Sequence, residues 1–261
     1  MAAENRTTII KSALTVLTVL QVFGRLPEEA SLAEVATEVG MPKMKTFRSL
    51  NTLVHAGFLS QNPANRKYRL HYPVLELARK LLDQQSIRAV SHEALQNLAI
   101  ELGEDITVAV LDQHREEVVF IERLRGGARI SFFCDVGKRL PLHVGAAAKS
   151  IMAHLPRDQF EAYLQSFVPA RISPYTIIQA DELRRQRDQI QEKGYAFSDQ
   201  EVDEGVAAVG ACIVDAAGYP AAGIAIASVS IKMTPDRITK LGNILRETTA
   251  NISAQLGYIK D

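Results

Sequence analysis

Residues 31–57 read SLAEVATEVGMPKMKTFRSLNTLVHAG and decide the fold of the N-terminal part of the chain. Ser31 and Glu34 have the Ser-x-x-Glu spacing of a capping box, which predicts that a helix begins here. Gly40 is suited to end this helix because glycine adopts the left-handed conformation, and Pro42 can stand at the start of the next helix. The stretch therefore predicts two helices joined by a turn of about three residues.

The second of these helices has one apolar and one cationic face. Leu50, Leu53 and Val54 recur at helical spacing and predict the face that packs into the core. The opposite face carries cations, and no acid lies between Met41 and Ala56. A solvated face normally mixes both signs of charge, so this one favours contact with a DNA groove. The residues expected to contact DNA from this helix are Lys43, Met44, Lys45, Phe47 and Arg48.

A strand, a turn and a second strand follow this helix. Residues 58–61 and 67–70 flank a turn over residues 62–65, which is rich in Asn and Pro. The pattern predicts a hairpin, and therefore the wing of a winged helix-turn-helix domain. Arg66 and Lys67 lie at its tip, where they can meet phosphates or the adjacent minor groove.

Charge is distributed unevenly along a chain of 261 residues that has no formal net charge. From Gly40 to Lys80 there are eight Lys and Arg against one acid, whereas from Ser86 to the end there are 19 against 23. A basic N-terminal module on a mildly acidic second one is typical of a DNA reader with a further, non-DNA domain. We expect domains over residues 1–72 and 87–261, joined by a linker helix over residues 73–86.

Several classes of protein are disfavoured. Cys134 and Cys212 lie far apart without metal-ligand spacing, which indicates reduced thiols in a cytoplasmic protein. The first residues lack the order of a signal peptide, and no segment reaches the roughly 18 apolar residues of a membrane span. Nucleophile-elbow, Walker A and dinucleotide-binding glycine patterns are missing. We therefore expect no enzyme, no metal, no other cofactor and no contact with a membrane.

The C-terminal part predicts a sheet with helices packed on it, in an α+β fold. Alternating runs over 106–111 and 118–124 indicate an antiparallel pair, and residues 129–134 a third strand. The near-continuous apolar runs 206–214 and 221–229 indicate two central strands. Helices of the whole chain outside the segment 31–57 and the linker are expected over residues 9–23, 92–102, 146–154, 180–193 and 234–256.

Four segments, in this order, resemble the IclR family of bacterial transcriptional regulators. They are GMPKMKTFRSLNTL from Gly40, LPLHVGAAAKSIMAHLP from Leu140, the pair Tyr175-Thr176, and GYAFSDQEVDEGVAAVGACIVDAAGYPAAGIAIAS from Gly194. The resemblance implies an N-terminal winged helix-turn-helix and a GAF-like C-terminal domain, an antiparallel sheet flanked by helices, that binds a small effector. It also implies a homodimer or tetramer on palindromic, double-stranded operator DNA, and hence a ligand-responsive repressor or activator.

Two departures from the family pattern bear on specificity. Met44 and Lys45 stand where many relatives have a small hydroxyl pair, so we expect an operator particular to this chain. Ala225 and Ala227 stand where relatives that bind small polar acids have a Ser-x-Ser pair. The pocket implied by the resemblance is then less polar and favours an organic acid with an apolar or aromatic body. The residues expected to form its body are Phe132, Cys212, Ala225 and Ala227.

Other candidate pocket residues admit two interpretations each. Gly145, Ala146 and Ala147 open a helix whose first N–H groups attract a carboxylate, or they are small so that the helix packs close to the sheet. Glu201 and Asp203 belong to an acidic cluster that either is solvated or orients the ligand and orders a lid over the pocket.

Two further side chains remain ambiguous. Cys212, although placed in the pocket motif, lies in an apolar strand, where cysteine is commonly a small buried hydrophobe. His143 could pair with a carboxylate or be a satisfied core histidine.

An alternative function is a protein-interaction module, in which the winged helix docks a protein and the second domain only oligomerises. A steep salt dependence of promoter binding separates the two functions, because only the DNA reader releases counterions. For the DNA reader we expect at least a dimer, with contacts from the helix over residues 9–23 and from the linker helix, since a two-fold pair reads a palindrome.

Overall fold

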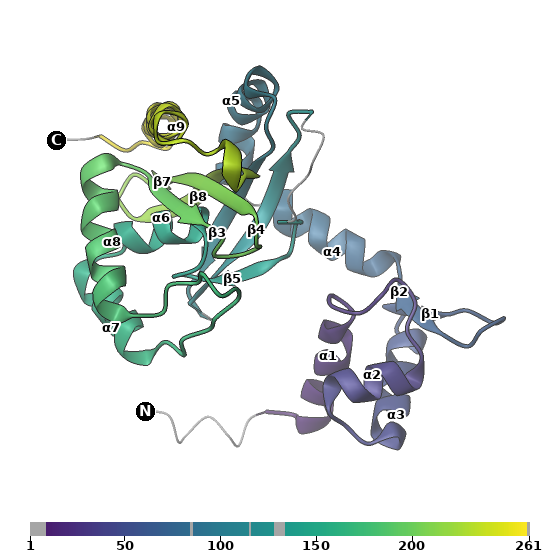
Figure 1. Cartoon of the computed structure of the whole chain (residues 1–261). Coiled ribbons are helices and arrows are strands. Elements are labelled where there is room, and N and C mark those ends of the chain that lie inside the picture. Colours follow the sequence, from purple (N-terminus) through teal and green to yellow (C-terminus); the bar gives the residue numbers. More distant parts are fainter. Residues whose placement is uncertain (1–8, 84–85, 115, 128–133, 260–261) are drawn as a thin grey trace. The chain divides into compact units, whose positions relative to one another are not determined.

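The computed structural model describes residues 9–83, 86–114, 116–127 and 134–259 (Figure 1). The chain divides into two compact units, residues 1–84 and 85–261. Helix α4 (Tyr72–Asp83) belongs to the first unit, and helix α5 (Ser86–Leu102) begins the second.

The N-terminal unit is a winged helix-turn-helix. Its capping box is confirmed, since Ser31 N donates to Glu34 Oε2 at 2.7 Å and Glu34 N donates to Ser31 Oγ at 3.3 Å. Gly40 ends the first helix of the motif with φ 66°. The elements are α1 (Lys11–Val22), α2 (Leu32–Val39), α3 (Lys43–His55), the antiparallel strands β1 (Leu59–Gln61) and β2 (Tyr68–Leu70), and α4. The core residues are Val19, Val22, Phe23, Ala30, Val35, Leu50, Leu53, Leu59 and Tyr68.

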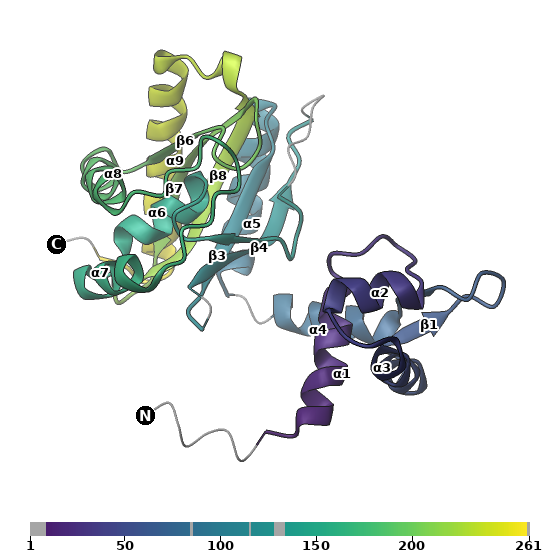
Figure 2. The same ribbon diagram turned by 60° about the horizontal axis from the view of Figure 1, so that its bottom comes forward.

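The C-terminal unit is a six-stranded antiparallel sheet in the order β5-β4-β3-β8-β7-β6. The strands are β3 (Ile106–Asp112), β4 (Glu117–Leu124), β5 (Arg139–Pro141), β6 (Ala196–Asp199), β7 (Val206–Val214) and β8 (Pro220–Val229). Besides α5, the helices are α6 (Ala146–His154), α7 (Arg157–Ser166), α8 (Ala180–Lys193) and α9 (Pro235–Gln255). Helix α6 lies on one face of β7 and β8, and α5 and α9 cover the other face (Figures 1 and 2). The fold is α+β, as expected, and both predicted central strands are interior.

Helix α6 approaches the sheet closely because two strand residues beneath it are glycines. A Cβ on Gly210 of β7 would lie 2.7 Å from the carbonyl carbon of Ala146. A Cβ on Gly223 of β8 would lie 2.3 Å from the carbonyl oxygen of Ala147. Side chains cannot occupy such distances, so the small residues on both sides allow the backbones to touch. This contact fixes the first turn of α6 over the sheet.

Four differences from the sequence prediction concern short or weakly patterned elements. Strands β5 and β6 have three and four residues and were not predicted. Helix α7 was also missed, although Phe160, Tyr163 and Leu164 are buried at helical spacing. Helix α5 begins six residues before the expected start at residue 92. The strand expected over residues 129–134 falls outside the described residues, apart from Cys134, which lies in no strand.

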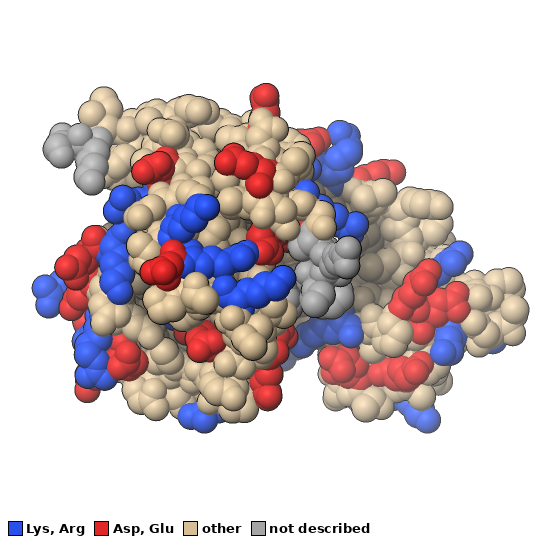
Figure 3. Space-filling model, turned by 45° about the horizontal axis from the view of Figure 1, so that its top comes forward, with Lys and Arg blue, Asp and Glu red and all other residues tan. Residues whose placement is uncertain are grey.

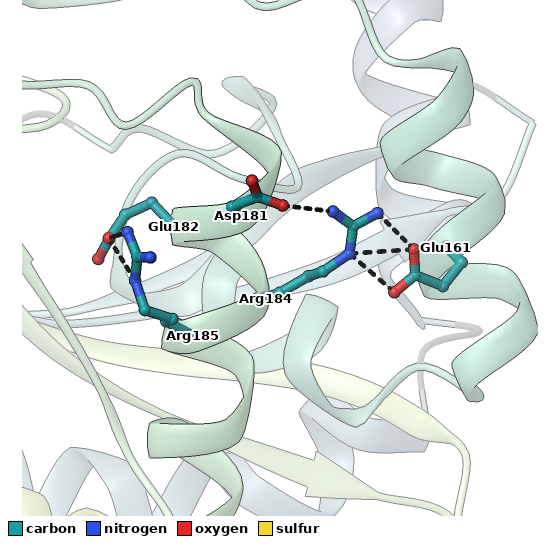
Figure 4. Close-up of polar contacts among 5 residues, drawn as sticks. All are labelled: Glu161, Asp181, Glu182, Arg184 and Arg185. Atoms are coloured by element: carbon teal, nitrogen blue, oxygen red, sulfur yellow. Dashed lines mark hydrogen bonds and ion pairs between the residues drawn. The ribbon is translucent and has the colours of Figure 1, made fainter.

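Helices α7 and α8 are joined at the surface by an ion-pair cluster (Figure 4). Arg184 of α8 donates to Glu161 of α7 at 2.6 Å and to Asp181 of its own helix at 2.9 Å. A second pair within α8 joins Arg185 to Glu182. These side chains are largely solvated, so the cluster orients the two helices more than it stabilises them.

Among the described helices, none combines the length and the apolar character that crossing a membrane requires.

Candidate functional site

Helix α3 displays its cationic face to solvent. Thr46 and Leu50 are fully buried and fix the rotation of the helix. Lys43, Lys45 and Arg48 are exposed on the other side, and within the described part of the chain none of them has an ion-pair partner. An unneutralised row of cations on an exposed helix is what a phosphate backbone attracts.

Two apolar side chains share this exposed face of α3. Met44 is 65% exposed and Phe47 39% exposed. Large apolar groups at a helix surface suit contact with the methyl groups and sugar edges of a groove. The described acids before α3, which are Glu28, Glu29, Glu34 and Glu38, lie outside this helix.

The wing is held by an acid at its base. Glu29 accepts from Asn62 Nδ2 at 3.0 Å and from Asn65 Nδ2 at 2.7 Å. The bond from Asn65, followed by that from Asn62, lowers the pKa of Glu29. Arg66 is exposed at the tip with φ 60°, while Lys67 is half-buried. The wing therefore presents one free cation at its tip beside α3.

Charge on the C-terminal unit has a different pattern. On the face seen in Figure 3, Lys and Arg of this unit are interspersed with Asp and Glu. The single-sign cationic surface is thus a property of α3 and not of this face of the second unit.

A cavity of about 540 Å³, measured to its mouth, opens where α6 begins above the sheet. Its lining is mainly apolar and comes from the sheet floor, the start of α6, and loop 200–205 between β6 and β7. The lining residues are Thr107, Phe120, Cys134, Leu140, Val144, Gly145, Ala146, Ala147, Ala148, Ser198, Val202, Asp203, Val206, Ala208, Ala225 and Ala227.

Strand register brings the small side chains of the floor together. Ala227 of β8 lies opposite Ala208 of β7, which lies opposite Ser198 of β6. One step along, Ala225 lies opposite Thr107 of β3. Because opposite residues in antiparallel strands point to the same face, these side chains leave a hollow that larger residues would fill.

The first turn of α6 points its N–H groups toward this cavity. The helical hydrogen bonds begin with Lys149 N donating to Gly145 O at 3.0 Å. Ala146, Ala147 and Ala148 are therefore the first-turn residues whose N–H groups lack a helical acceptor. Gly145 N donates to Glu201 Oε2 at 3.1 Å. Such a helix start attracts an anion.

Glu201 is buried behind the cavity wall and does not line the cavity. It forms an ion pair with Lys149, which is fully buried on α6. Burial lowers the pKa of Lys149, and the charge of Glu201 opposes this shift. Glu201 therefore acts inside the protein, and its expected solvated or ligand-orienting position is corrected. Asp203, two residues on, is exposed and lines the cavity.

The structure brings most of the predicted pocket residues together, and one is corrected. Cys212 belongs to the apolar core and does not line the cavity. It lies opposite Gly223, beneath the part of α6 that covers the sheet, and burial raises the pKa of its thiol. Phe132 lies outside the described residues. The predicted residues that share the cavity are Gly145, Ala146, Ala147, Asp203, Ala225 and Ala227.

Three polar lining residues were missed by the sequence argument. Ser198 is 3% exposed, and its hydroxyl has no hydrogen-bond partner within the described chain. Thr107 Oγ1 donates to Ala225 O at 3.4 Å. Burial raises the pKa of the Cys134 thiol to about 11. The signal for Ser198 is its pairing with Ala208, which becomes visible only once β6 is known.

His143 is a satisfied core histidine. Tyr163 OH donates to His143 Nδ1 at 2.6 Å, and Nε2 donates to Ala170 O at 3.2 Å, which assigns the neutral ring. Burial lowers the pKa of His143 accordingly.

Comparison with known proteins gives the same division of the chain. Residues 13–63 match the model of the IclR helix-turn-helix domain, and residues 79–254 match that of the bacterial transcriptional regulator IclR C-terminal domain. HTH-type transcriptional regulator KipR of Bacillus subtilis is 30% identical over 258 residues, covering 99% of this chain and 100% of that protein.

Solved structures agree with the fold. The IclR protein of Thermotoga maritima has a TM-score of 0.76 and 27% identity, with 96% of this chain and 100% of that one covered. An IclR homologue from Microbacterium hydrocarbonoxydans, complexed with 4-hydroxybenzoate, has a TM-score of 0.75 and 22% identity, with 94% and 98% covered. The chain therefore belongs to the IclR family of bacterial transcriptional regulators, which bind DNA through a helix-turn-helix and sense effectors.

Proposed function

We propose that the effector of this regulator is a monocarboxylic acid with an apolar or aromatic body, bound in the cavity under the start of α6. The observation that carries the proposal is the pairing of free first-turn N–H groups with an alanine floor. A carboxylate at Ala146–Ala148 places the body of the ligand on Ala208, Ala225 and Ala227. The similar fold that holds 4-hydroxybenzoate supports this class of ligand.

Two polar groups narrow the choice further. The unpartnered Ser198 hydroxyl can bond a hydroxyl or carbonyl on the ligand, which would remove the cost of a buried polar group without a partner. Asp203 at the mouth would repel a second negative charge. A dicarboxylate is therefore disfavoured relative to a hydroxylated monocarboxylate.

On the DNA side, α3 reads base edges through Arg48, with Lys43, Lys45, Met44 and Phe47 beside it. Arg66 and Lys67 of the wing contact phosphates. Exposed cations together with exposed apolar groups on one helix face support this assignment.

A homodimer presents two such helices to a palindromic operator. Ile10, Leu14 and Leu17 are 69%, 53% and 54% exposed and form one apolar stripe on α1. On α4, Leu75, Leu77 and Leu81 are 66%, 61% and 59% exposed. Apolar surface of this extent on two helices indicates contact with another chain. The effector then acts by stabilising one arrangement of the protomers, which sets the spacing of the two α3 helices.

Two experiments test these proposals. An operator is first selected from random DNA, and its affinity is measured from low to high salt. The DNA reader should lose affinity by orders of magnitude with a constant log–log slope, whereas a protein-interaction module would select no operator and show no such slope.

Ligand class is tested by thermal unfolding with 4-hydroxybenzoate, benzoate and benzamide. The two carboxylates should raise the Tm in proportion to the logarithm of their concentration, and the uncharged benzamide should not. An equal shift with benzamide would remove the carboxylate from the argument.

A further inference from the structure

The buried ion pair between Lys149 and Glu201 contacts neither DNA nor the cavity. Lys149 Nζ donates to the Glu201 carboxylate, to Gln186 Oε1 at 3.0 Å and to Phe197 O at 2.7 Å. An ammonium has three N–H donors, and all three are used here. These acceptors lie on α8, on β6 and in loop 200–205. One fully buried side chain of α6 thus joins three other parts of the C-terminal unit.

Glu201 extends this connection to the cavity wall. Its other oxygen accepts from Gly145 N at 3.1 Å, at the start of α6. The next residues, Val202 and Asp203, both line the cavity. A Cβ on Gly145 would lie 3.0 Å from Val202 Cγ2, so loop and helix start are in close contact. The position of the Glu201 carboxylate therefore sets the distance between the two sides of the cavity.

The same loop is held from its outer side. Ser173 Oγ donates to Gln200 O at 2.6 Å, and Thr176 Oγ1 donates to Glu201 O at 2.8 Å. Gln200 has φ 58°, in the left-handed region that residues other than glycine seldom adopt. Such a conformation persists where the surroundings impose it. The loop is thus constrained both by backbone contacts and by the buried pair.

We propose that Lys149 is a positioning residue of the effector site: by holding the Glu201 carboxylate against Gly145, it keeps Val202 and Asp203 in the cavity wall. Lys149 does not touch the ligand. The proposal rests on the proposed function only in taking the cavity as the ligand site, because closure of the wall by Lys149 does not depend on what fills the cavity.

Cys134 reports on this wall without any ligand. It lines the same cavity, and burial is the main cause of its raised pKa. Asp203 and Asp135 raise this pKa further, while Lys138 and Arg123 lower it. The thiolate is the reactive form, so a fall of one pKa unit increases the rate of alkylation about tenfold at neutral pH.

The test is the rate of Cys134 alkylation by iodoacetamide, measured by mass spectrometry in a Cys212→Ala background. Lys149→Met keeps the length of the side chain and removes the ammonium. We expect alkylation about tenfold faster, with the midpoint of its pH profile below the wild-type value, because water enters and Asp203 moves away. The matched control is Arg184→Met, which removes an exposed ion pair of the same unit (Figure 4) and should leave the rate unchanged.

A second variant keeps the test decisive if Lys149→Met does not fold. Glu201→Gln preserves the volume and an acceptor for Lys149, and weakens the bond to Gly145. Its rate should lie between those of the wild type and Lys149→Met. Wild-type rates in the folded Lys149→Met protein, or in Glu201→Gln if only that variant folds, would overturn the positioning role.

Calorimetric titration with benzoate then connects the wall to ligand binding. We expect weaker binding to Lys149→Met than to the wild type and to Arg184→Met. If the wild type does not bind benzoate, the proposed ligand class fails while the alkylation rates still decide the role of Lys149. Equal affinities in the presence of faster alkylation would show that the wall does not position the ligand.

Discussion

Replacing Gly223 by alanine should displace α6 and destabilise the C-terminal unit. The new Cβ would lie 2.3 Å from Ala147 O, 2.9 Å from Ala147 C and 3.0 Å from Ser150 Oγ. An ordinary contact needs at least 3.4 Å, so the helix and the strand must separate by about 1 Å. The strand cannot easily retreat, because Gly223 pairs with Cys212 on one side and Ala109 on the other.

The size of the effect follows from two opposing contributions. Overpacking in a dense core costs about 1–3 kcal/mol, and two rigid backbones place Gly223→Ala at the upper end. Loss of glycine also restricts the unfolded chain, which returns about 0.4–1 kcal/mol. We therefore expect a net loss of about 2 kcal/mol. For a unit of this size, that loss lowers the Tm by about 4–8 °C.

Differential scanning calorimetry measures this change in the transition of the C-terminal unit. Gly24→Ala is the matched control, because a Cβ there meets only Gln21 O, at an ordinary 3.5 Å, and the site lies in the other unit. It should leave the C-terminal transition unchanged. If the transition of Gly223→Ala coincides with that of the wild type, α6 can retreat at little cost and the close-contact argument is refuted.

Three further predictions concern the DNA face, the cavity and acid stability. Arg48→Ala should weaken operator binding by about 1–3 kcal/mol, and Lys43→Ala should reduce the salt slope by about one; unchanged gel-shift titrations of both would exclude α3 as the reading helix. Ala227→Leu should fill the cavity and abolish benzoate binding by calorimetry while DNA binding survives, whereas wild-type affinity would place the ligand elsewhere. Burial lowers the pKa of His143 below its ordinary 6.5 and favours the neutral ring, so the unfolding free energy should be constant above about pH 6.5 and fall as the pH drops below it. Urea titrations at several pH values should show a smaller acid loss in His143→Gln, and an equal loss would contradict the assignment.

The DNA-reading part of the fold could be predicted because its determinants are local. The bonds between Ser31 and Glu34, the left-handed Gly40 and the burial of Leu50 all depend on residues within one or two turns. Helix α3 accordingly begins and ends within about two residues of its expected bounds. Local signals of this kind do not require knowledge of which strands pair.

The cavity could be predicted only in part, because it depends on contacts between distant segments. Ala225 and Ala227 could be placed through the resemblance, but Ser198 required the pairing of β6 with β7. Cys212 shows the same difficulty from the other side. Alternation along a strand identifies the face of the sheet on which a side chain lies, but it does not show where α6 begins to cover that face. Lys149 was missed as well, since a lysine in a small-residue helix gives no sign that its partners lie on other elements.

Small residues have two separate functions beneath α6, and the difference predicts how specificity can change. Gly210 and Gly223 contact the helix backbone directly, so any side chain there moves the helix. Ala208, Ala225 and Ala227 lie beyond the start of the helix and border empty space, where a larger or more polar side chain alters the shape of the cavity without touching the backbone of α6. Substitution at the alanine positions should therefore exchange one acid for another, as with Ala225→Ser and smaller polar acids. Substitution at the glycine positions should reduce the stability of the unit together with its affinity for every ligand.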